Sequence, residues 1–126
     1  MTRSVRLQLR RSRGFDLQAA SRALNGLPAV VVSRPSPFGN PFTFEAVIEE
    51  GLAADKAEAR KIAVQRFEDW IGGGDRWWRG PESEVRRAEI LSRLPELEGR
   101  NLACWCPLDG PCHADALLRL ANTPGS

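Results

Sequence analysis

All three cysteines and the only histidine of this chain lie within one ten-residue segment, residues 104–113, called the cysteine loop below. Its last residues, Pro111, Cys112 and His113, are predicted to open a helix, because proline is favoured in a first helical turn. The free N–H groups and the dipole of a helix N-terminus attract anions and lower the pKa of a thiol. We therefore predict that Cys112 and His113 are catalytic, with Cys112 as a thiolate that reacts faster than Cys104 and His113 as an acid or base.

The same side chains suggest a zinc site, since three thiolates and one imidazole are a permitted tetrahedral ligand set. Adjacent Cys112 and His113 would diverge by about 100° on a helix, which opposes their convergence on one ion. We therefore expect no stoichiometric zinc and no cofactor, and a zinc-stabilised structural domain is kept as an alternative. Cys104 is expected to be a small buried side chain at a strand end. Cys106 and Asp115 are expected to contact a ligand.

A second segment with chemical potential is residues 34–42, Arg-Pro-Ser-Pro-Phe-Gly-Asn-Pro-Phe, called the arginine loop below. Its three prolines and one glycine exclude regular structure and indicate a loop of defined shape. A guanidinium held at the end of a strand suits a phosphate or a carboxylate, a glycine allows close backbone approach, and an amide both donates and accepts. The predicted ligand-binding residues are Arg34, Phe38, Gly39 and Asn40. The alternative is a loop whose phenylalanines simply pack inward.

The elements that must position these loops can be predicted from hydrophobic periodicity and from helix caps. Strands are expected over residues 5–9, 29–32 and 101–105, and helices over residues 16–24, 55–71, 82–94 and 112–121, with a short helical turn from 43 to 50. The alternating first strand is expected to be peripheral or antiparallel, and the β-branched second strand to be covered on both faces. The fold class is α/β, a small three-layer, Rossmann-like sheet with helices on both faces. Both loops would leave the carboxyl ends of strands, where such sheets bind ligands.

Length and composition support one cytoplasmic domain over residues 1–126. A 42% apolar fraction is ample for one core, charges interrupt every apolar run of the N-terminal segment, and no stretch is long enough to span a membrane. An odd number of clustered cysteines is a poor disulfide framework. The net charge of +2 hides an asymmetry, because residues 1–34 hold seven arginines and one acid. This basic third makes a nucleic-acid-binding module a second alternative, in which Trp77 and Trp78 would stack on bases.

The two loops also carry a resemblance. The residues Val32-Ser33-Arg34-Pro35 and then Phe38-Gly39-Asn40-Pro41-Phe42, followed later by Leu102-Ala103-Cys104-Trp105-Cys106 and Cys112-His113-Ala114-Asp115, resemble the hallmarks of an uncharacterised bacterial and phage family, domain of unknown function 4326. The basic stretch 5–14 is similar to the opening of that family. Phe38 stands where many members carry tryptophan. The resemblance indicates which proteins are related to this chain but does not indicate a reaction.

Taken together, these patterns predict an enzyme or a sensor that binds a small anionic ligand, such as a nucleotide or nucleoside derivative. The ligand would lie between the arginine loop and the N-terminus of the last helix, with Arg34 on the anion and Asn40 orienting it. The sequence does not decide whether a reaction follows, nor the oligomeric state.

Overall fold

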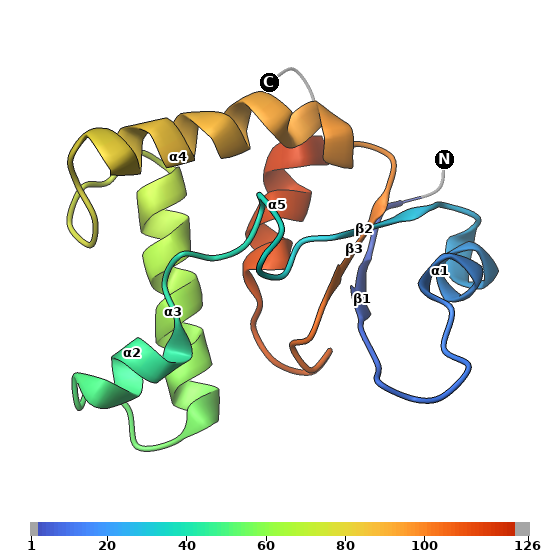
Figure 1. Ribbon diagram of the computed structural model, residues 1–126, viewed down its shortest axis with the longest axis horizontal. Helices are drawn as coiled ribbons and strands as arrows, with labels where there is room; N and C mark the ends of the chain where they lie inside the picture. The colour runs from blue at the N-terminus through green and yellow to red at the C-terminus, as the bar shows by residue number, and fades with distance from the viewer. Residues whose placement is uncertain (1–2, 123–126) are drawn as a thin grey trace.

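The computed structural model describes residues 3–122 (Figure 1). Its elements, in chain order, are β1 (Arg6–Gln8), α1 (Leu17–Asn25), β2 (Ala29–Val31), α2 (Phe44–Glu49), α3 (Lys56–Ile71), α4 (Pro81–Arg93), the 3₁₀ turn η1 (Leu94–Leu97), β3 (Asn101–Cys104) and α5 (His113–Asn122). Every predicted strand and helix is present, with bounds that differ by a few residues at most. No helix among the described residues has the length and apolar character needed to cross a membrane.

The three strands form one parallel sheet in the order β1-β3-β2. β3 is the central strand and all four of its residues are buried. The peripheral position predicted for the first strand is confirmed, since β1 is an edge strand. The prediction that the second strand is covered on both faces is wrong, because β2 forms the other edge and Val31 is 39% exposed.

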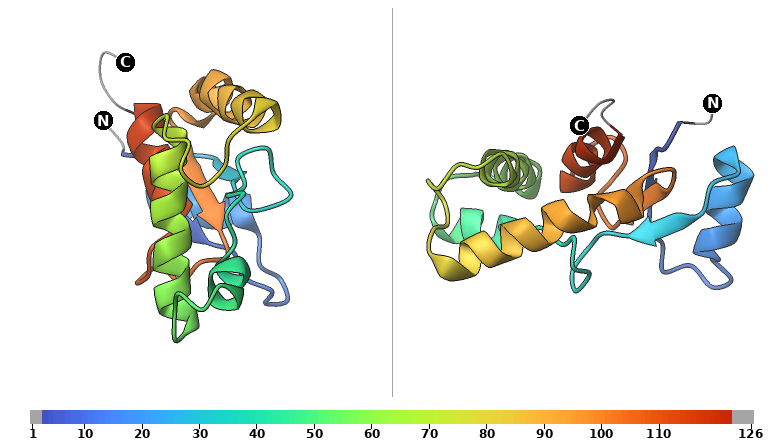
Figure 2. Two further views of the ribbon diagram at one scale, coloured as in Figure 1. Left: turned by 90° about the vertical axis from the view of Figure 1, so that its left-hand side faces the viewer. Right: turned by 90° about the horizontal axis from the view of Figure 1, so that it is seen from above.

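The helices lie on both sides of this small sheet. In Figure 1 and in the right-hand view of Figure 2, α1 lies on one side of the sheet and α5 on the other, with α3 beyond α5. α4 runs at a steep angle to α3 and α5, and α2 packs against α3. The chain is therefore a mixed α/β protein with a three-stranded parallel sheet. The finer prediction of a Rossmann-like three-layer fold is not established, because α2, α3 and α4 pack mainly on one another and on α5.

Side-chain caps explain where three of the helices begin. The side chains of Asp16, Thr43 and Asp55 accept hydrogen bonds from the backbone N–H groups of Ala19, Ala46 and Glu58, at 3.0, 3.1 and 2.8 Å. Such caps satisfy donors that the helix itself leaves free. α1 ends at Gly26, whose φ of 82° is a left-handed conformation that favours glycine. These caps and this glycine set where the helices begin and end, and therefore where the loops between them lie.

The main core lies between α3, α4, α5 and β3. Its largest fully buried members are Trp70, Phe67, Ile90, Leu97, Leu102 and Leu117. Trp70 donates from Nε1 to the Ser83 hydroxyl at 2.9 Å, and Trp78 stacks on it with ring centroids 5.5 Å apart. Trp78 therefore packs against the core. Trp77 is partly exposed and lies beside the guanidinium of Arg66, 4.4 Å from its ring centroid.

A buried polar network joins the sheet to α1. Asn101, fully buried at the start of β3, accepts from the Val5 backbone N–H at 3.0 Å and donates to the Ser21 hydroxyl at 2.8 Å. It also exchanges two hydrogen bonds with the side-chain amide of Asn25, at 2.8 and 2.9 Å. The Asn101 side chain thus fixes the register of β1 against β3 and holds α1 against both strands.

Candidate functional site

The arginine loop and the cysteine loop meet at one pocket of about 200 Å³. From the first loop and its preceding residue come Ser33, Arg34, Asn40 and Phe42, and from the second come Cys104, Trp105, Cys106, Pro111 and His113. The wall is completed by residues that follow the arginine loop, at the start of α2 and in α3. These are Thr43, Phe44, Arg60, Ala63 and Val64. The two segments singled out in the sequence are therefore neighbours in space.

Arg34 is exposed and lines the pocket, as expected of an anion-binding side chain. Gly39 is buried and packs directly under it. A Cβ atom at Gly39 would lie 2.6 Å from Cγ of Arg34 and 3.1 Å from its Cα, closer than van der Waals contact allows. Glycine here lets the loop fold back on itself and hold Arg34 in place.

The other arginine-loop residues divide between the pocket and the core. Asn40 lines the pocket, but its Oδ1 accepts from the Phe42 N–H at 2.9 Å and its Nδ2 donates to the Ala63 carbonyl at 3.3 Å. Its amide therefore holds the loop against α3. Phe38 is buried in the main core and does not contribute to the pocket lining, whereas Phe42 does. Phe38, which was predicted to bind a ligand, therefore follows the alternative in which the phenylalanines of this loop pack inward.

Sequence reasoning missed the pocket residues outside the two loops, among them Arg60 and Phe44. The Arg60 guanidinium lies over the Phe44 ring, 5.1 Å from its centroid. No sequence signal pointed to Arg60, because its place at the pocket depends on how α3 packs against the two loops; it shares one face of the helix with Ala63, three residues later. Ala63 also lines the pocket. The pocket thus has a second guanidinium on α3.

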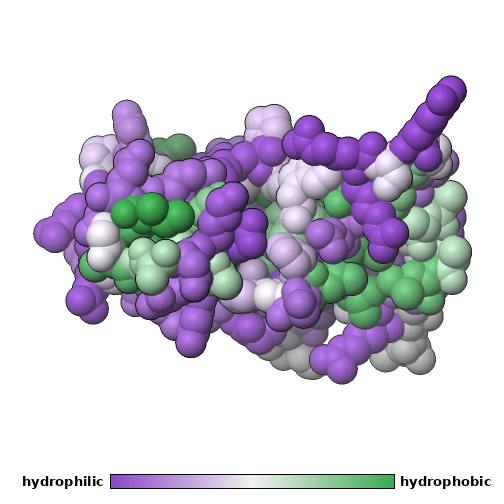
Figure 3. Space-filling model, turned by 90° about the horizontal axis from the view of Figure 1, so that it is seen from below, coloured by the Kyte–Doolittle hydropathy of each residue, from purple (hydrophilic) through white to green (hydrophobic). Residues whose placement is uncertain are grey.

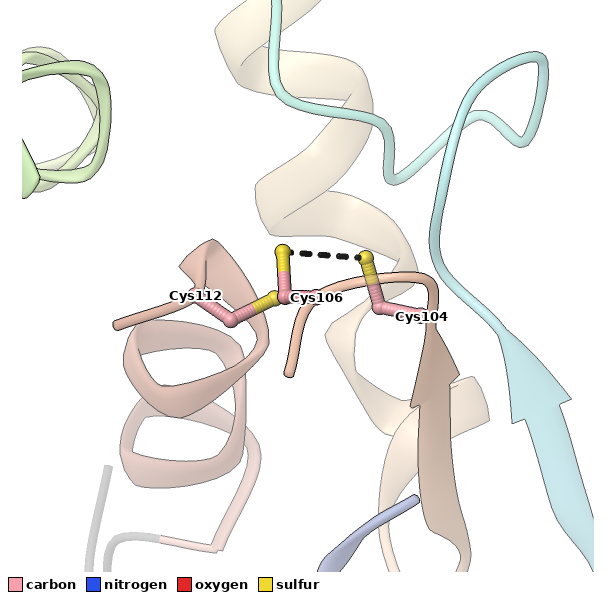
Figure 4. Close-up of side chains that lie close together, drawn as sticks. All are labelled: Cys104, Cys106 and Cys112. Atoms are coloured by element: carbon pink, nitrogen blue, oxygen red, sulfur yellow. Dashed lines mark hydrogen bonds between the residues drawn. The ribbon is translucent and has the colours of Figure 1, made fainter. Parts of the chain in front are cut away.

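The three cysteine side chains converge at the edge of the pocket (Figure 4). Their Sγ atoms all lie within 4.8 Å of one another, and those of Cys104 and Cys106 are 3.7 Å apart. All three thiols are free. Cys104 ends β3, Cys106 follows in the loop and Cys112 directly precedes α5. The divergence expected of the adjacent Cys112 and His113 agrees with this, since Cys112 joins the other two cysteines and His113 is not part of the group.

His113 is buried and turned toward the backbone of the arginine loop. Its Nε2 lies 2.9 Å from the carbonyl oxygen of Val32 and 3.1 Å from that of Phe38. Carbonyl oxygens only accept, so Nε2 carries the proton and donates. Burial lowers the pKa of His113, which favours the neutral ring with a free lone pair on Nδ1. That Nδ1 lies 3.7 Å from the Cys112 sulfur.

The predicted thiolate at Cys112 is opposed by its surroundings. Hydrogen bonding to Cys104 and Cys106, together with burial, raises the pKa of the Cys112 thiol, and its side chain is 0% exposed. The pKa of Cys104 is lowered instead, because a thiolate there accepts from the Cys106 and Cys112 thiols. Once one thiol has ionised, the remaining two resist ionisation, and the pKa of Cys106 is also raised. The Ala114 backbone N–H at the start of α5 lowers the pKa of Cys112, but Cys104, Cys106 and burial raise it by more.

Arg6 is the main structural residue of the cysteine loop that sequence reasoning missed. Its Nη2 donates to the carbonyl oxygens of Pro107, Leu108 and Gly110, at 3.2, 2.8 and 2.7 Å. Its Nη1 pairs with the Asp115 carboxylate at 3.2 Å. The predicted ligand contact at Asp115 is therefore occupied by an arginine of β1. The alternating pattern of residues 5–9 indicated a strand and gave no sign of this partner.

Burial predicts the order in which the cysteines react. In the reduced protein without added metal, we expect iodoacetamide to modify Cys106 about tenfold or more faster than Cys112. Cys106 is half-buried and lines the pocket, whereas Cys112 is 0% exposed and must wait for a local opening that costs about 1.4 kcal/mol or more. Residue-resolved mass spectrometry over time measures the three rates. In guanidinium chloride the rates should become similar, and faster modification of Cys112 in the native state would contradict this ordering.

The side of the molecule that carries the cysteine loop is mainly hydrophilic. This loop lies at the lower side in Figure 1, and Figure 3 shows that face with hydrophobic residues gathered in separate patches near its two ends. A polar surface around the site is compatible with a charged ligand from water.

Comparison with known proteins identifies the family of this chain. Neither curated proteins nor solved structures include one that matches this chain. A family model described as domain of unknown function (DUF4326) matches residues 16–123. That match takes in both loops, all three cysteines and His113, and it bears out the resemblance of the two motifs. The chain belongs to this family, DUF4326.

Proposed function

We propose that this protein binds a small anionic ligand that contains a ring, such as a nucleotide or nucleoside derivative, between its arginine and cysteine loops. The observation that carries the proposal is the lining of the pocket. Arg34 and Arg60 both contribute to it, and none of the described residues that line it is aspartate or glutamate. Two guanidinium groups without a neighbouring carboxylate favour a phosphate or carboxylate.

The apolar part of the wall favours a flat ring. Phe42, Phe44 and Trp105 line the pocket, and aromatic faces stack well on bases and other planar groups. A volume of about 200 Å³ is below the roughly 300–1,000 Å³ typical of pockets for drug-sized ligands. The ligand is therefore small, with its ring inside and its anionic group at Arg34, which is exposed at the rim.

A bound ligand would meet the thiols of Cys104 and Cys106, because these two line the pocket. Cys112 contributes no lining and instead contacts its two neighbours. His113 lines the pocket and holds its Nδ1 toward the Cys112 sulfur. The role that we propose for Cys112 and His113 is therefore to set the protonation of the thiol cluster, while Cys106 contacts the ligand.

Isothermal titration calorimetry with orthophosphate, ribose 5-phosphate, adenosine and AMP tests this function. We expect AMP to bind more tightly than either of its parts, because the ring and the anion occupy different walls. Arg34→Gln and Arg60→Gln should each weaken AMP binding about tenfold, since a hydrogen bond to a charged group contributes about 1.5–3 kcal/mol and exposure reduces this. Thermal unfolding of both variants should match the parent, because both are at the pocket and outside the core.

The matched control is Arg22→Gln, an exposed arginine on α1 that does not line the pocket. It should leave AMP binding unchanged. A short single-stranded oligonucleotide serves as the competing ligand class. If the oligonucleotide binds with a steep salt dependence while none of the four small molecules binds, the nucleic-acid alternative replaces this proposal.

A further inference from the structure

The thiol cluster has the dimensions of a metal site. Zinc–sulfur bonds of about 2.3 Å in a tetrahedron place neighbouring sulfurs about 3.8 Å apart. The Cys104 and Cys106 sulfurs are 3.7 Å apart, and the sulfur of Cys112 lies within 4.8 Å of both. We infer that Cys104, Cys106 and Cys112 bind one Zn²⁺ ion as thiolates, with the fourth coordination position directed toward the pocket.

The charge of such a centre is balanced by groups around it. Three thiolates and one Zn²⁺ carry a net charge of −1. The Cys106 backbone N–H is directed to the Cys104 sulfur, the Ala114 backbone N–H to the Cys112 sulfur, and the Arg6 guanidinium binds the loop between Cys106 and Cys112. N–H groups and a cation that stabilise thiolates are expected around a bound metal, whereas simple apolar packing of thiols has no need of them.

Without a cation the cluster holds its charge poorly. Three thiolates whose sulfur atoms all lie within 4.8 Å of one another repel, because like charges at that distance oppose each other. A divalent ion removes this opposition, since it attracts all three sulfurs at once. Thiolates are soft ligands, and a compact tetrahedral set of sulfur atoms selects zinc over magnesium or calcium.

The backbone that presents the sulfurs is already fixed. Arg6 holds the carbonyl oxygens of Pro107, Leu108 and Gly110, so the chain between Cys106 and Cys112 is tied to β1. Cys104 belongs to the central strand of the sheet. A metal therefore meets ligands that need move by only about 1 Å, the difference between the 4.8 Å limit of the cluster and a tetrahedral edge.

The fourth position is assigned from the pocket. Cys104 and Cys106 line it and Cys112 lies behind them. His113 lies outside the cluster: its Nδ1 is 3.7 Å from the Cys112 sulfur but is not within reach of all three sulfurs. An ion on the three sulfurs is thus open on the pocket side, as in zinc sites that keep one position for water or substrate. This inference goes beyond the proposed ligand and needs no ligand to be tested.

The test uses the full chain, purified under reducing conditions, stripped of metal and titrated with Co²⁺ and Zn²⁺ alone. We expect one ion per chain by elemental analysis, and intense thiolate-to-cobalt charge-transfer absorption that Zn²⁺ abolishes. Cys106→Ser should weaken Zn²⁺ binding by at least about 100-fold, more than changes around the first ligands usually cause. Cys106 is the half-buried member of the three, so its variant is the one best able to fold.

Two controls make the outcome decisive. Arg34→Gln should keep the cobalt spectrum even where it weakens AMP binding, so failure of the metal site and failure of the ligand proposal can be told apart. Added imidazole should shift the visible cobalt bands, because it can occupy the open position. Absence of charge-transfer absorption, or tight Zn²⁺ binding by a folded Cys106→Ser variant, would overturn the site. A cobalt spectrum insensitive to imidazole but altered in His113→Gln would overturn the open position, since His113 would then be the fourth ligand.

Discussion

Replacement of Asn101 by leucine is expected to lower the free energy of unfolding by about 2–4 kcal/mol. The side chain is 0% exposed and makes four hydrogen bonds, to Val5, to Ser21 and twice to Asn25. Leucine has the same branched shape and is larger than asparagine, so the variant leaves no cavity and the loss reports the hydrogen bonds together with any crowding by the methyl groups. Ser21, a fully buried residue of α1, keeps its hydrogen bond to the Leu27 carbonyl oxygen but loses the donor that its own oxygen accepts from. An unsatisfied buried polar group costs about 1–3 kcal/mol.

Urea denaturation followed by circular dichroism measures this change, provided that the dependence on urea is the same in both proteins. The control is Asn122→Leu at the exposed end of α5, where the change should be about 0.5 kcal/mol or less. A loss below about 1 kcal/mol for Asn101→Leu would show that water replaces the network, and that this side chain does not fix the register of the sheet.

Replacement of Arg6 by methionine is the second change with a large expected effect, about 2–4 kcal/mol of lost stability. The Arg6 side chain is 9% exposed, and its guanidinium donates to three carbonyl oxygens and to the Asp115 carboxylate. Methionine keeps the apolar stem but supplies no donor. The carbonyl contacts dominate, because the Asp115 side chain is half exposed and an ion pair with it contributes little.

Two measurements separate a local role from a general one. Hydrogen exchange of residues 105–111 should become faster in Arg6→Met by more than in the rest of the chain, and Cys106 should be alkylated faster. Asp115→Asn, which removes only the ion pair, should cost less than about 1 kcal/mol. Arg79→Met, at an exposed position before α4, is the matched control. It should leave stability, hydrogen exchange and the alkylation of Cys106 unchanged. Uniform loss of protection would mean that Arg6 supports the sheet and not the loop.

The local elements of this fold were predictable because their signals are local. Asp16, Thr43 and Asp55 each cap a helix, and Gly26 ends one, as their residue types suggest. The order of the strands was not predictable, because the sequence of a short parallel strand does not indicate which strands it pairs with. The error at β2 has this origin. Its unbroken β-branched sequence is typical of a strand covered on both faces, yet Val31 lies on an edge.

The candidate site was predictable in outline and not in detail. Loops that follow strands of one parallel sheet open at one edge, so the meeting of the two loops follows from topology. Which phenylalanine of the arginine loop faces the pocket depends on how the loop folds, and the structure buries Phe38 while Phe42 lines the wall. The protonation state of Cys112 depends on its distances to Cys104 and Cys106. These distances cannot be derived from the spacing of the cysteines in the sequence. Arg60 and Arg6 come from distant parts of the chain.

The central place of β3 has a consequence for the synthesis of the protein. β1 and β2 are joined only through β3, and the hydrogen bond between Val5 and Asn101 spans 96 residues. While the ribosome has released only the first hundred residues, both edge strands lack their hydrogen-bonding neighbour. Contacts so distant in sequence form late and slowly. The sheet, the Asn101 network and the pocket should therefore arise together in one late step, and until then the first two strands are exposed to proteases and to other unfolded chains.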